Sequence, residues 1–295
     1  MDRYSARVSV AIVTDTTAYL PASVVSERGI TVVPLHVVVA GQEFSEGVDI
    51  STAEVAKALR AYKPVSTSRP SPSAFLSAYE AAAAGGATAI VSIHISGEMS
   101  STVQSAHLAA QHSPVPVTVV DSRSLGMAMG YAVLTACDAA AAGASAEDVA
   151  AQALARCAAS TVVFYVDTLE HLRRGGRIGS ASAFLGSALA IKPILSLKDG
   201  HISALEKVRT SARALARLEE LAAAAAERPP DGADAVDISV HHLDSAARAE
   251  ELARRLEERV GNAHEVRVVE LGAVVGAHVG PGTIAVAVSP RVVGA

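Results

Sequence analysis

Short apolar runs alternate with helical patterns along the chain, and this alternation limits the fold more than any other feature of the sequence. Residues 8–14 form a continuous apolar run of the kind buried in parallel sheets. Similar runs occur at residues 30–39, 89–95, 117–120 and 161–166. Helical patterns lie between most of these runs, and together they predict an α/β protein.

Capping and turn residues mark the ends of several of these elements. Ser51–Glu54 has the spacing of a capping box, and so does Ser101–Gln104. Ser71 followed by Pro72 predicts the first turn of another helix. Asp199–Gly200 lies between two alternating runs and predicts a hairpin.

The length of the chain predicts two domains. A chain of 295 residues can bury two cores of ordinary size. The composition of the connecting segments places the boundary near residue 155. We therefore expect an N-terminal α/β domain over residues 1–155 and a C-terminal α/β domain over residues 156–295.

Composition excludes several classes of function. The net charge is −5, aromatic residues make up 3% of the chain, and tryptophan is absent. These values give neither the basic field nor the stacking surfaces that nucleic acids require. Cys137 and Cys157 have no metal-binding spacing, and no apolar stretch reaches the length of a membrane span. The sequence predicts a soluble cytoplasmic protein that does not bind nucleic acid.

Signatures of catalysis are weak. The sequence contains no phosphate-binding P-loop, no nucleophile elbow and no dinucleotide fingerprint. His241 and His242 end a predicted strand, but no third metal ligand accompanies them. We expect no metal, no cofactor and no catalytic residues of its own.

Polar residues gather where predicted strands end or helices begin. There are four such clusters: residues 14–16, 66–71, 94–102 and 121–124. Each can be explained by ordinary helix capping. Together they offer hydroxyl groups and free backbone N–H groups, which suit a ligand with one small acidic group.

A glycine-rich segment near the C-terminus, Gly272–Gly282, contains the single titratable residue His278. Glycine lets backbone approach a ligand closely, and Pro281 would stiffen the turn. We expect a bare loop here. It is either a simple turn with an incidental histidine or a loop that brings His278 to a ligand.

Seven motifs, spread in order over residues 8–288, resemble those of the DegV family of fatty-acid-binding proteins. They are Thr14–Thr16, Thr67–Ser71, Ser92–Ser96, Gly175–Ile178, Lys192–Ile194, Lys207–Thr210 and Gly276–Gly282. The resemblance implies two α/β domains that enclose a lipid tunnel. It also implies a non-catalytic carrier that presents a long-chain fatty acid, such as palmitate, to a separate ATP-dependent fatty acid kinase, which makes the acyl phosphate.

The resemblance assigns roles to five residues. Thr67, Ser100, His278 and Ser96 would bind the carboxylate of the fatty acid, and Arg209 would support productive interaction with the kinase. It also allows a transient contact with a membrane surface.

The sequence departs from the family pattern at Gly97, Glu98 and Ser101, and Arg69 stands where glutamine is common. Arg69 would add a cation near the carboxylate. A different hypothesis remains open, in which the chain is an enzyme acting on a small acidic or phosphorylated metabolite at the same cluster.

Overall fold

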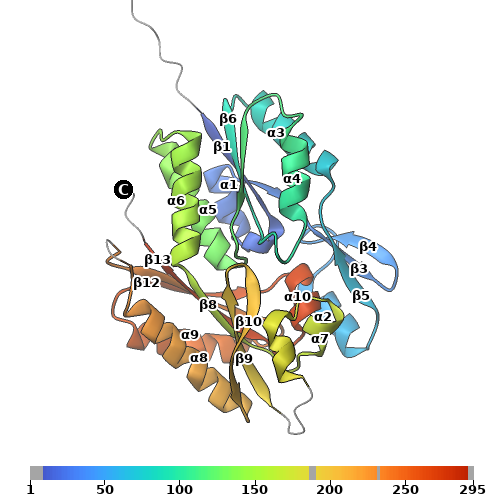
Figure 1. Ribbon diagram of the computed structural model, residues 1–295, viewed down its shortest axis with the longest axis vertical. Coiled ribbons are helices and arrows are strands. Elements are labelled where there is room, and N and C mark those ends of the chain that lie inside the picture. Colours follow the sequence, from blue (N-terminus) through green and yellow to red (C-terminus); the bar gives the residue numbers. More distant parts are fainter. Residues whose placement is uncertain (1–8, 186–190, 231–232, 292–295) are drawn as a thin grey trace, which may run out of the picture.

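The computed structural model describes residues 9–185, 191–230 and 233–291, and it has two lobes built around separate sheets (Figure 1). We call the lobe around the first sheet, up to residue 160, the N-terminal lobe and the lobe around the second sheet, from residue 161, the C-terminal lobe. Both lobes mix strands and helices, so the predicted α/β class is confirmed. The division into two domains at residues 155 and 156 stays a prediction.

The N-terminal lobe is built on a four-stranded parallel sheet. Its strands lie in the order β2 (Thr31–Val33), β1 (Val10–Asp15), β6 (Ala89–His94) and β7 (Val117–Asp121). Its helices are α1 (Ala22–Arg28), α3 (Pro72–Ala84), α4 (Thr102–Ala110), α5 (Met127–Ala141) and α6 (Ala146–Ala159).

Helices cover both faces of this sheet because neighbouring strand residues point in opposite directions. Ile12 packs in the core that α5 and α6 cover, and Val13 packs in the core that α3 and α4 cover (Figure 1). This explains why the strands read as continuous apolar runs.

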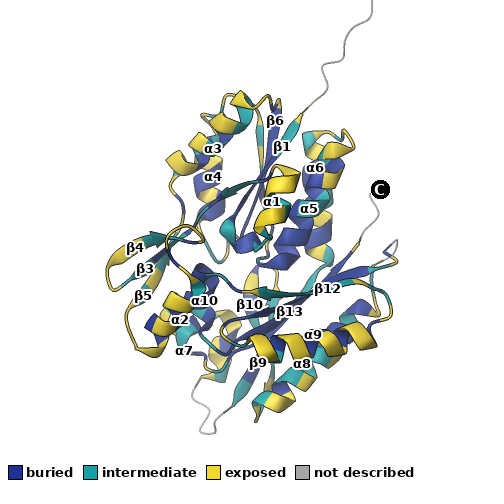
Figure 2. Ribbon diagram, turned by 180° about the vertical axis from the view of Figure 1, so that it is seen from behind, coloured by how far each residue is buried: buried dark blue, intermediate teal, exposed yellow. Residues whose placement is uncertain are grey.

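The C-terminal lobe has a six-stranded mixed sheet. Its order is β10 (His201–Val208), β9 (Lys192–Lys198), β8 (Thr161–Tyr165), β13 (Ile284–Pro290), β11 (Val236–His242) and β12 (Ala263–Glu270). Helices α8 (Ser211–Ala226) and α9 (Ala246–Arg259) cover one face and expose their outer sides (Figure 2). The other face packs toward the N-terminal lobe, where β13 contacts α5 and α6.

The predicted hairpin is confirmed. Strands β9 and β10 pair antiparallel, and Asp199 and Gly200 between them have φ angles of 51° and 82°. Both values lie in the left-handed region, which a type I′ turn requires and which Asp–Gly tolerates.

A third, three-stranded sheet is inserted after β2. It contains β4 (Gln42–Ser45), β3 (His36–Val39) and β5 (Val65–Ser68), and helix α2 (Thr52–Arg60) accompanies it. The apolar run over residues 30–39 therefore forms two strands in different sheets, β2 and β3. The chain leaves the first sheet after Val33, passes through Pro34, which cannot donate to a strand ladder, and enters the small sheet at His36.

The predicted glycine-rich loop is also partly wrong, because residues Ala273–Val279 form helix α10. Two further helical segments, α7 (Glu170–Arg174) and the 3-10 helix η2 (Gly179–Phe184), precede β9, and a short 3-10 helix η1 (Thr16–Ala18) follows β1. Helix α10 packs on α2, β3 and β5. A C-terminal segment thus lies against the small sheet of the N-terminal half.

Candidate functional site: a cavity between the lobes with a polar end

A cavity of about 470 Å³ lies where the two lobes and the small sheet meet. This volume falls within the range of small-molecule sites. In the parallel sheet, β2 lies on one side of β1 and β6 on the other, so the switch in strand order falls between β1 and β6. Residues that follow β6 line the cavity, as expected for ligand sites at the carboxyl ends of strands.

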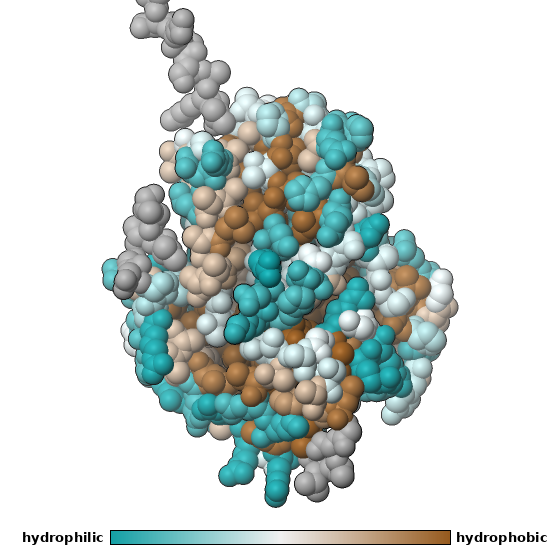
Figure 3. All heavy atoms as spheres, viewed as in Figure 1, coloured by the Kyte–Doolittle hydropathy of each residue, from teal (hydrophilic) through white to brown (hydrophobic). Residues whose placement is uncertain are grey.

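Most of the cavity wall is apolar, and both halves of the chain contribute to it. The apolar lining residues are Leu35, Ile95, Met99, Leu125, Leu172, Ile202, Val274, Val275 and Val279. Figure 3 shows hydrophilic residues gathered across the middle of the molecule, where the lobes meet. Because the apolar lining residues come from both lobes, an apolar ligand in this cavity would lie between the lobes.

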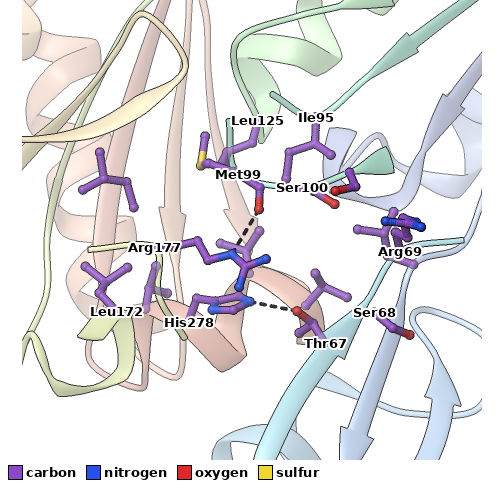
Figure 4. A pocket seen from close by; sticks show the side chains of 16 residues that line it. Thr67, Ser68, Arg69, Ile95, Met99, Ser100, Leu125, Leu172, Arg177 and His278 are labelled. Atoms are coloured by element: carbon purple, nitrogen blue, oxygen red, sulfur yellow. Dashed lines mark hydrogen bonds between the residues drawn. The ribbon is translucent and has the colours of Figure 1, made fainter. Parts of the chain in front are cut away.

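Thr67 and His278 meet at the polar part of the cavity. Thr67 lies in β5, and His278 lies in the last turn of α10. The Thr67 Oγ1 and His278 Nε2 atoms are 2.9 Å apart (Figure 4). Helix α10 packs directly on β5, so the contact between these distant residues follows from the fold.

The environment of His278 keeps its imidazole neutral. Burial, with a smaller contribution from the nearby Arg177 guanidinium, lowers the pKa of His278 from 6.5 to about 4. Its Nδ1 atom is buried and has no hydrogen-bond partner in the part of the chain that the structure describes. Gly175 lies against Nδ1, and a Cβ atom at that position would overlap it.

Ser100 lines the same cavity, next to the start of α4. Its Oγ lies 2.8 Å from Thr102 Oγ1. The predicted capping box at Ser101–Gln104 is wrong, since Ser101 has φ −77° and ψ 24° and its side chain makes no capping hydrogen bond. Ser101, like Ser100, lines the cavity.

Two arginines line the cavity. Arg177 Nε donates to the Met99 carbonyl at 3.1 Å, and its Nη1 donates to the Gly175 carbonyl at 2.6 Å. Arg177 belongs to a motif shared with the family but was not among the predicted site residues. Its position in the glycine-rich Gly175–Ile178 motif was the available signal. Arg69, at the end of β5, is the second arginine.

The structure places Ser96 outside the lining of this cavity. Its hydroxyl is buried and donates to the Gly200 carbonyl at 2.9 Å, so it joins the loop after β6 to the β9–β10 hairpin. In this position the Ser96 hydroxyl hydrogen is used in a hydrogen bond within the protein.

Arg209 also lies outside the cavity. It is exposed and follows β10, immediately before Thr210, which caps α8. Thr67, Ser100 and His278 are thus brought together in one cavity, while Ser96 and Arg209 are not. Their assigned roles stay predictions.

A separate polar chain lies inside the N-terminal lobe. Tyr79 Oη donates to Ser92 Oγ at 2.9 Å, Ser92 Oγ lies 2.6 Å from His94 Nε2, and His94 Nδ1 lies 3.1 Å from Asp15 Oδ2. All four residues are fully buried.

Comparison with known proteins identifies the family. The model of an uncharacterised DegV protein family matches residues 9–291. A DegV domain-containing protein of Streptomyces coelicolor is 50% identical over 282 residues, which are 96% of this chain and 99% of that protein. The chain belongs to the DegV family.

Solved structures agree with this assignment. A fatty-acid-binding DegV family protein of Thermus thermophilus has a TM-score of 0.89 and 35% identity, over 96% of this chain and 99% of that one. DegV of Bacillus subtilis, described as a fatty acid binding protein, has a TM-score of 0.87 and 29% identity, over 96% and 100% of the two chains. None of the described helices is long and apolar enough to cross a membrane.

Proposed function

We propose that this protein binds a long-chain fatty acid, with its tail among the apolar residues of the cavity and its carboxylate at Thr67, Ser100 and His278. The observation that carries the proposal is one cavity that joins an apolar wall to the hydroxyl groups of Thr67 and Ser100 and the imidazole of His278. Fatty acid binding by the Thermus and Bacillus structures supports it.

The carboxylate needs hydrogen-bond donors, since a charged group in an apolar cavity without them is costly. A neutral His278 can donate from Nε2 to Thr67 Oγ1, which leaves the Thr67 hydroxyl hydrogen free for the ligand. Ser100 can donate in the same way. The positive end of the α4 dipole, next to Ser100, favours a negative charge there.

We further propose that the protein is a non-catalytic carrier in the cytoplasm that presents the carboxylate to an ATP-dependent fatty acid kinase. A neutral imidazole paired with a threonine, without a carboxylate to orient it, is a poor activator of a nucleophile. This supports binding over hydrolysis. Arg209, which is exposed and does not line the cavity, would contact the kinase.

The binding half is tested by native mass spectrometry of protein purified from a bacterial host. A bound acid of the length of palmitate is expected, and stripped protein should rebind palmitate with one-to-one stoichiometry. An empty cavity that does not take up palmitate, combined with hydrolytic turnover of small esters or phosphoesters, would instead support the enzyme hypothesis.

The carrier half is tested with Arg209→Ala on one preparation. We expect lipid occupancy and thermal stability close to those of the unchanged protein, with most acyl-phosphate formation lost when the cognate kinase and ATP are added. Arg213→Ala, a nearby exposed arginine on α8, is the matched control. Full phosphate transfer by Arg209→Ala would remove the role of Arg209, and lost occupancy would move it into the lipid site.

A further inference from the structure

The two arginines that line the cavity differ in what their guanidinium groups already bind. The Arg177 guanidinium donates to two backbone carbonyls, those of Met99 and Gly175. Arg69 takes part in no side-chain hydrogen bond or ion pair within residues 9–185, 191–230 and 233–291, although it lines the same cavity. The donors of Arg69 are therefore available to a ligand.

The position of Arg69 is set by the strand before it. Thr67 lies in β5, and Arg69 follows two residues later, so an extended backbone directs both side chains to the same side. The next residue, Pro70, is buried and restricts the backbone of Arg69 to extended conformations. Figure 4 shows Arg69 and Arg177 on opposite sides of Thr67, and both arginines line the same cavity as Ser100.

We propose that Arg69 is an additional head-group residue, whose guanidinium pairs with the carboxylate of the bound fatty acid at the mouth of the cavity. This inference rests on the proposed fatty-acid binding. The proposed carboxylate donors Thr67, Ser100 and His278 are neutral, and the other cation of the cavity, Arg177, already donates to the Met99 and Gly175 carbonyls, so Arg69 adds a guanidinium that no protein group engages within the described residues. A guanidinium can bind both carboxylate oxygens through two parallel N–H donors.

The pairing makes a specific prediction about ligand selectivity. A neutral head group, such as the hydroxyl of a fatty alcohol, can use Thr67 and Ser100 but gains little from a cation. Arg69 would therefore favour an acid over an alcohol of the same chain length. Because Arg69 is exposed, solvent and salt weaken the pairing, so its effect is smaller than that of a buried ion pair.

The experiment compares palmitate with 1-hexadecanol on stripped full-length protein at pH 8, using displacement of a fluorescent fatty-acid analogue. Arg69→Gln removes the charge and keeps a polar side chain, and Arg69→Lys keeps the charge without the planar fork. Arg213→Gln is the matched control, because it causes the same change in net charge on an exposed helix away from the cavity.

We expect Arg69→Gln to weaken palmitate binding about three- to tenfold and to leave hexadecanol binding unchanged, with Arg69→Lys in between. Added salt should reduce the preference of the unchanged protein for palmitate. Equal losses for both ligands would assign Arg69 a structural role, and no loss for either would make it a solvated surface residue. Both results overturn the inference while fatty-acid binding stands, whereas failure of the unchanged protein to bind palmitate overturns both.

Discussion

His94 and His278 each contact a hydroxyl group, but the surroundings of His94 suit a structural role and those of His278 suit ligand binding. His94 lies in a closed chain in which every polar atom has a partner inside the N-terminal lobe. A carboxylate can only accept, so His94 Nδ1 carries the hydrogen that Asp15 binds, and Nε2 accepts from Ser92. Within the described residues, His278 pairs only with Thr67, and its buried Nδ1 has no partner.

The comparison shows why residue types alone do not define an active site. Ser92, His94 and Asp15 have the composition of a hydrolytic triad. The Ser92 hydroxyl, however, is fully buried and already accepts from Tyr79, so no substrate can reach it. This series of hydrogen bonds instead holds the end of β6 in place, where Asp15 also accepts from the backbone N–H of Ile95 at 3.0 Å. The complete network stabilises the fold, and the incomplete pair is free to bind.

The strongest test of this contrast replaces each histidine with leucine. His94→Leu removes a donor to a buried carboxylate and an acceptor for Ser92, so we expect the free energy of unfolding to fall by about 3–5 kcal/mol. His278→Leu in ligand-free protein removes Nδ1, which has no partner among the described residues, and one hydrogen bond to the partly exposed Thr67, so we expect a loss of only about 1 kcal/mol. Urea unfolding of stripped protein measures both, and similar losses would remove the contrast.

The second test acts on the binding pair through its neighbour. Gly175 has φ −74°, which alanine also adopts, but a Cβ atom would overlap His278 Nδ1. We expect Gly175→Ala to displace His278 from Thr67 and to weaken palmitate binding roughly ten- to a hundredfold, the value of a charge-assisted hydrogen bond to the ligand.

Gly261→Ala is the control for this substitution, because a Cβ atom at Gly261 meets no other atom within 4 Å. It should bind palmitate like the unchanged protein. Undiminished palmitate binding by Gly175→Ala would mean that the position of His278 does not matter for the ligand.

Local sequence patterns predicted the elements of the fold where the pattern alone determines the backbone. The capping box at Ser51–Glu54 forms with both of its hydrogen bonds, and the Asp199–Gly200 hairpin forms as expected. The same capping pattern at Ser101–Gln104 fails, because the preceding loop holds Ser101 at ψ 24° and not in the extended conformation that the cap needs.

The loop expected over Gly272–Gly282 is largely a helix, again because tertiary packing determines the local backbone. Gly276 lies within helix α10, and a Cβ atom there would be 3.3 Å from the Leu243 side chain. This glycine allows the helix to pack closely on Leu243, although glycine-rich sequences are more typical of loops. Glu46, from the small sheet's end, accepts from the Val274 N–H and ties the start of α10 to the N-terminal half.

The candidate site was only partly accessible to sequence reasoning. The motifs supplied Thr67, Ser100 and His278, but 211 positions separate Thr67 from His278, and only the packing of α10 on β5 brings them together. Ser96 shares a motif with His94, yet its hydroxyl is taken by Gly200 of the other lobe. Hydrogen bonds between residues so far apart in the chain leave no local pattern in the sequence.

A smaller effect is expected when only the Thr67 hydroxyl is removed. Thr67→Val keeps the shape of the side chain and deletes the group that would donate to the carboxylate. We expect palmitate binding to weaken about tenfold, at the lower end of a charge-assisted hydrogen bond. Thr67→Ser keeps the hydroxyl and should bind nearly as well as the unchanged protein. Ser100→Ala should resemble Thr67→Val, and calorimetry with palmitate can measure all three.

The smallest expected effect is a change in the titration of His278 when ligand binds. In the folded protein burial lowers the pKa of His278 to about 4, below the ordinary value of 6.5. Between these pH values the unfolded chain binds more protons, so the free energy of unfolding falls as the pH decreases from 6.5 toward 4. Burial also lowers the pKa of His241 to about 4, so stability curves alone cannot separate the two histidines.

Residue-specific NMR titration can separate them, with His278→Leu identifying the His278 signal. A carboxylate beside His278 favours the charged imidazolium, so we expect palmitate to raise the pKa of His278 while 1-hexadecanol leaves it unchanged. His241 accepts a hydrogen bond from the Met127 N–H at 3.0 Å, outside the lining of the cavity, and should not respond to either ligand. Equal shifts with acid and alcohol would show that ligand burial, and not the carboxylate, governs His278, and the head group would then have to lie elsewhere in the cavity.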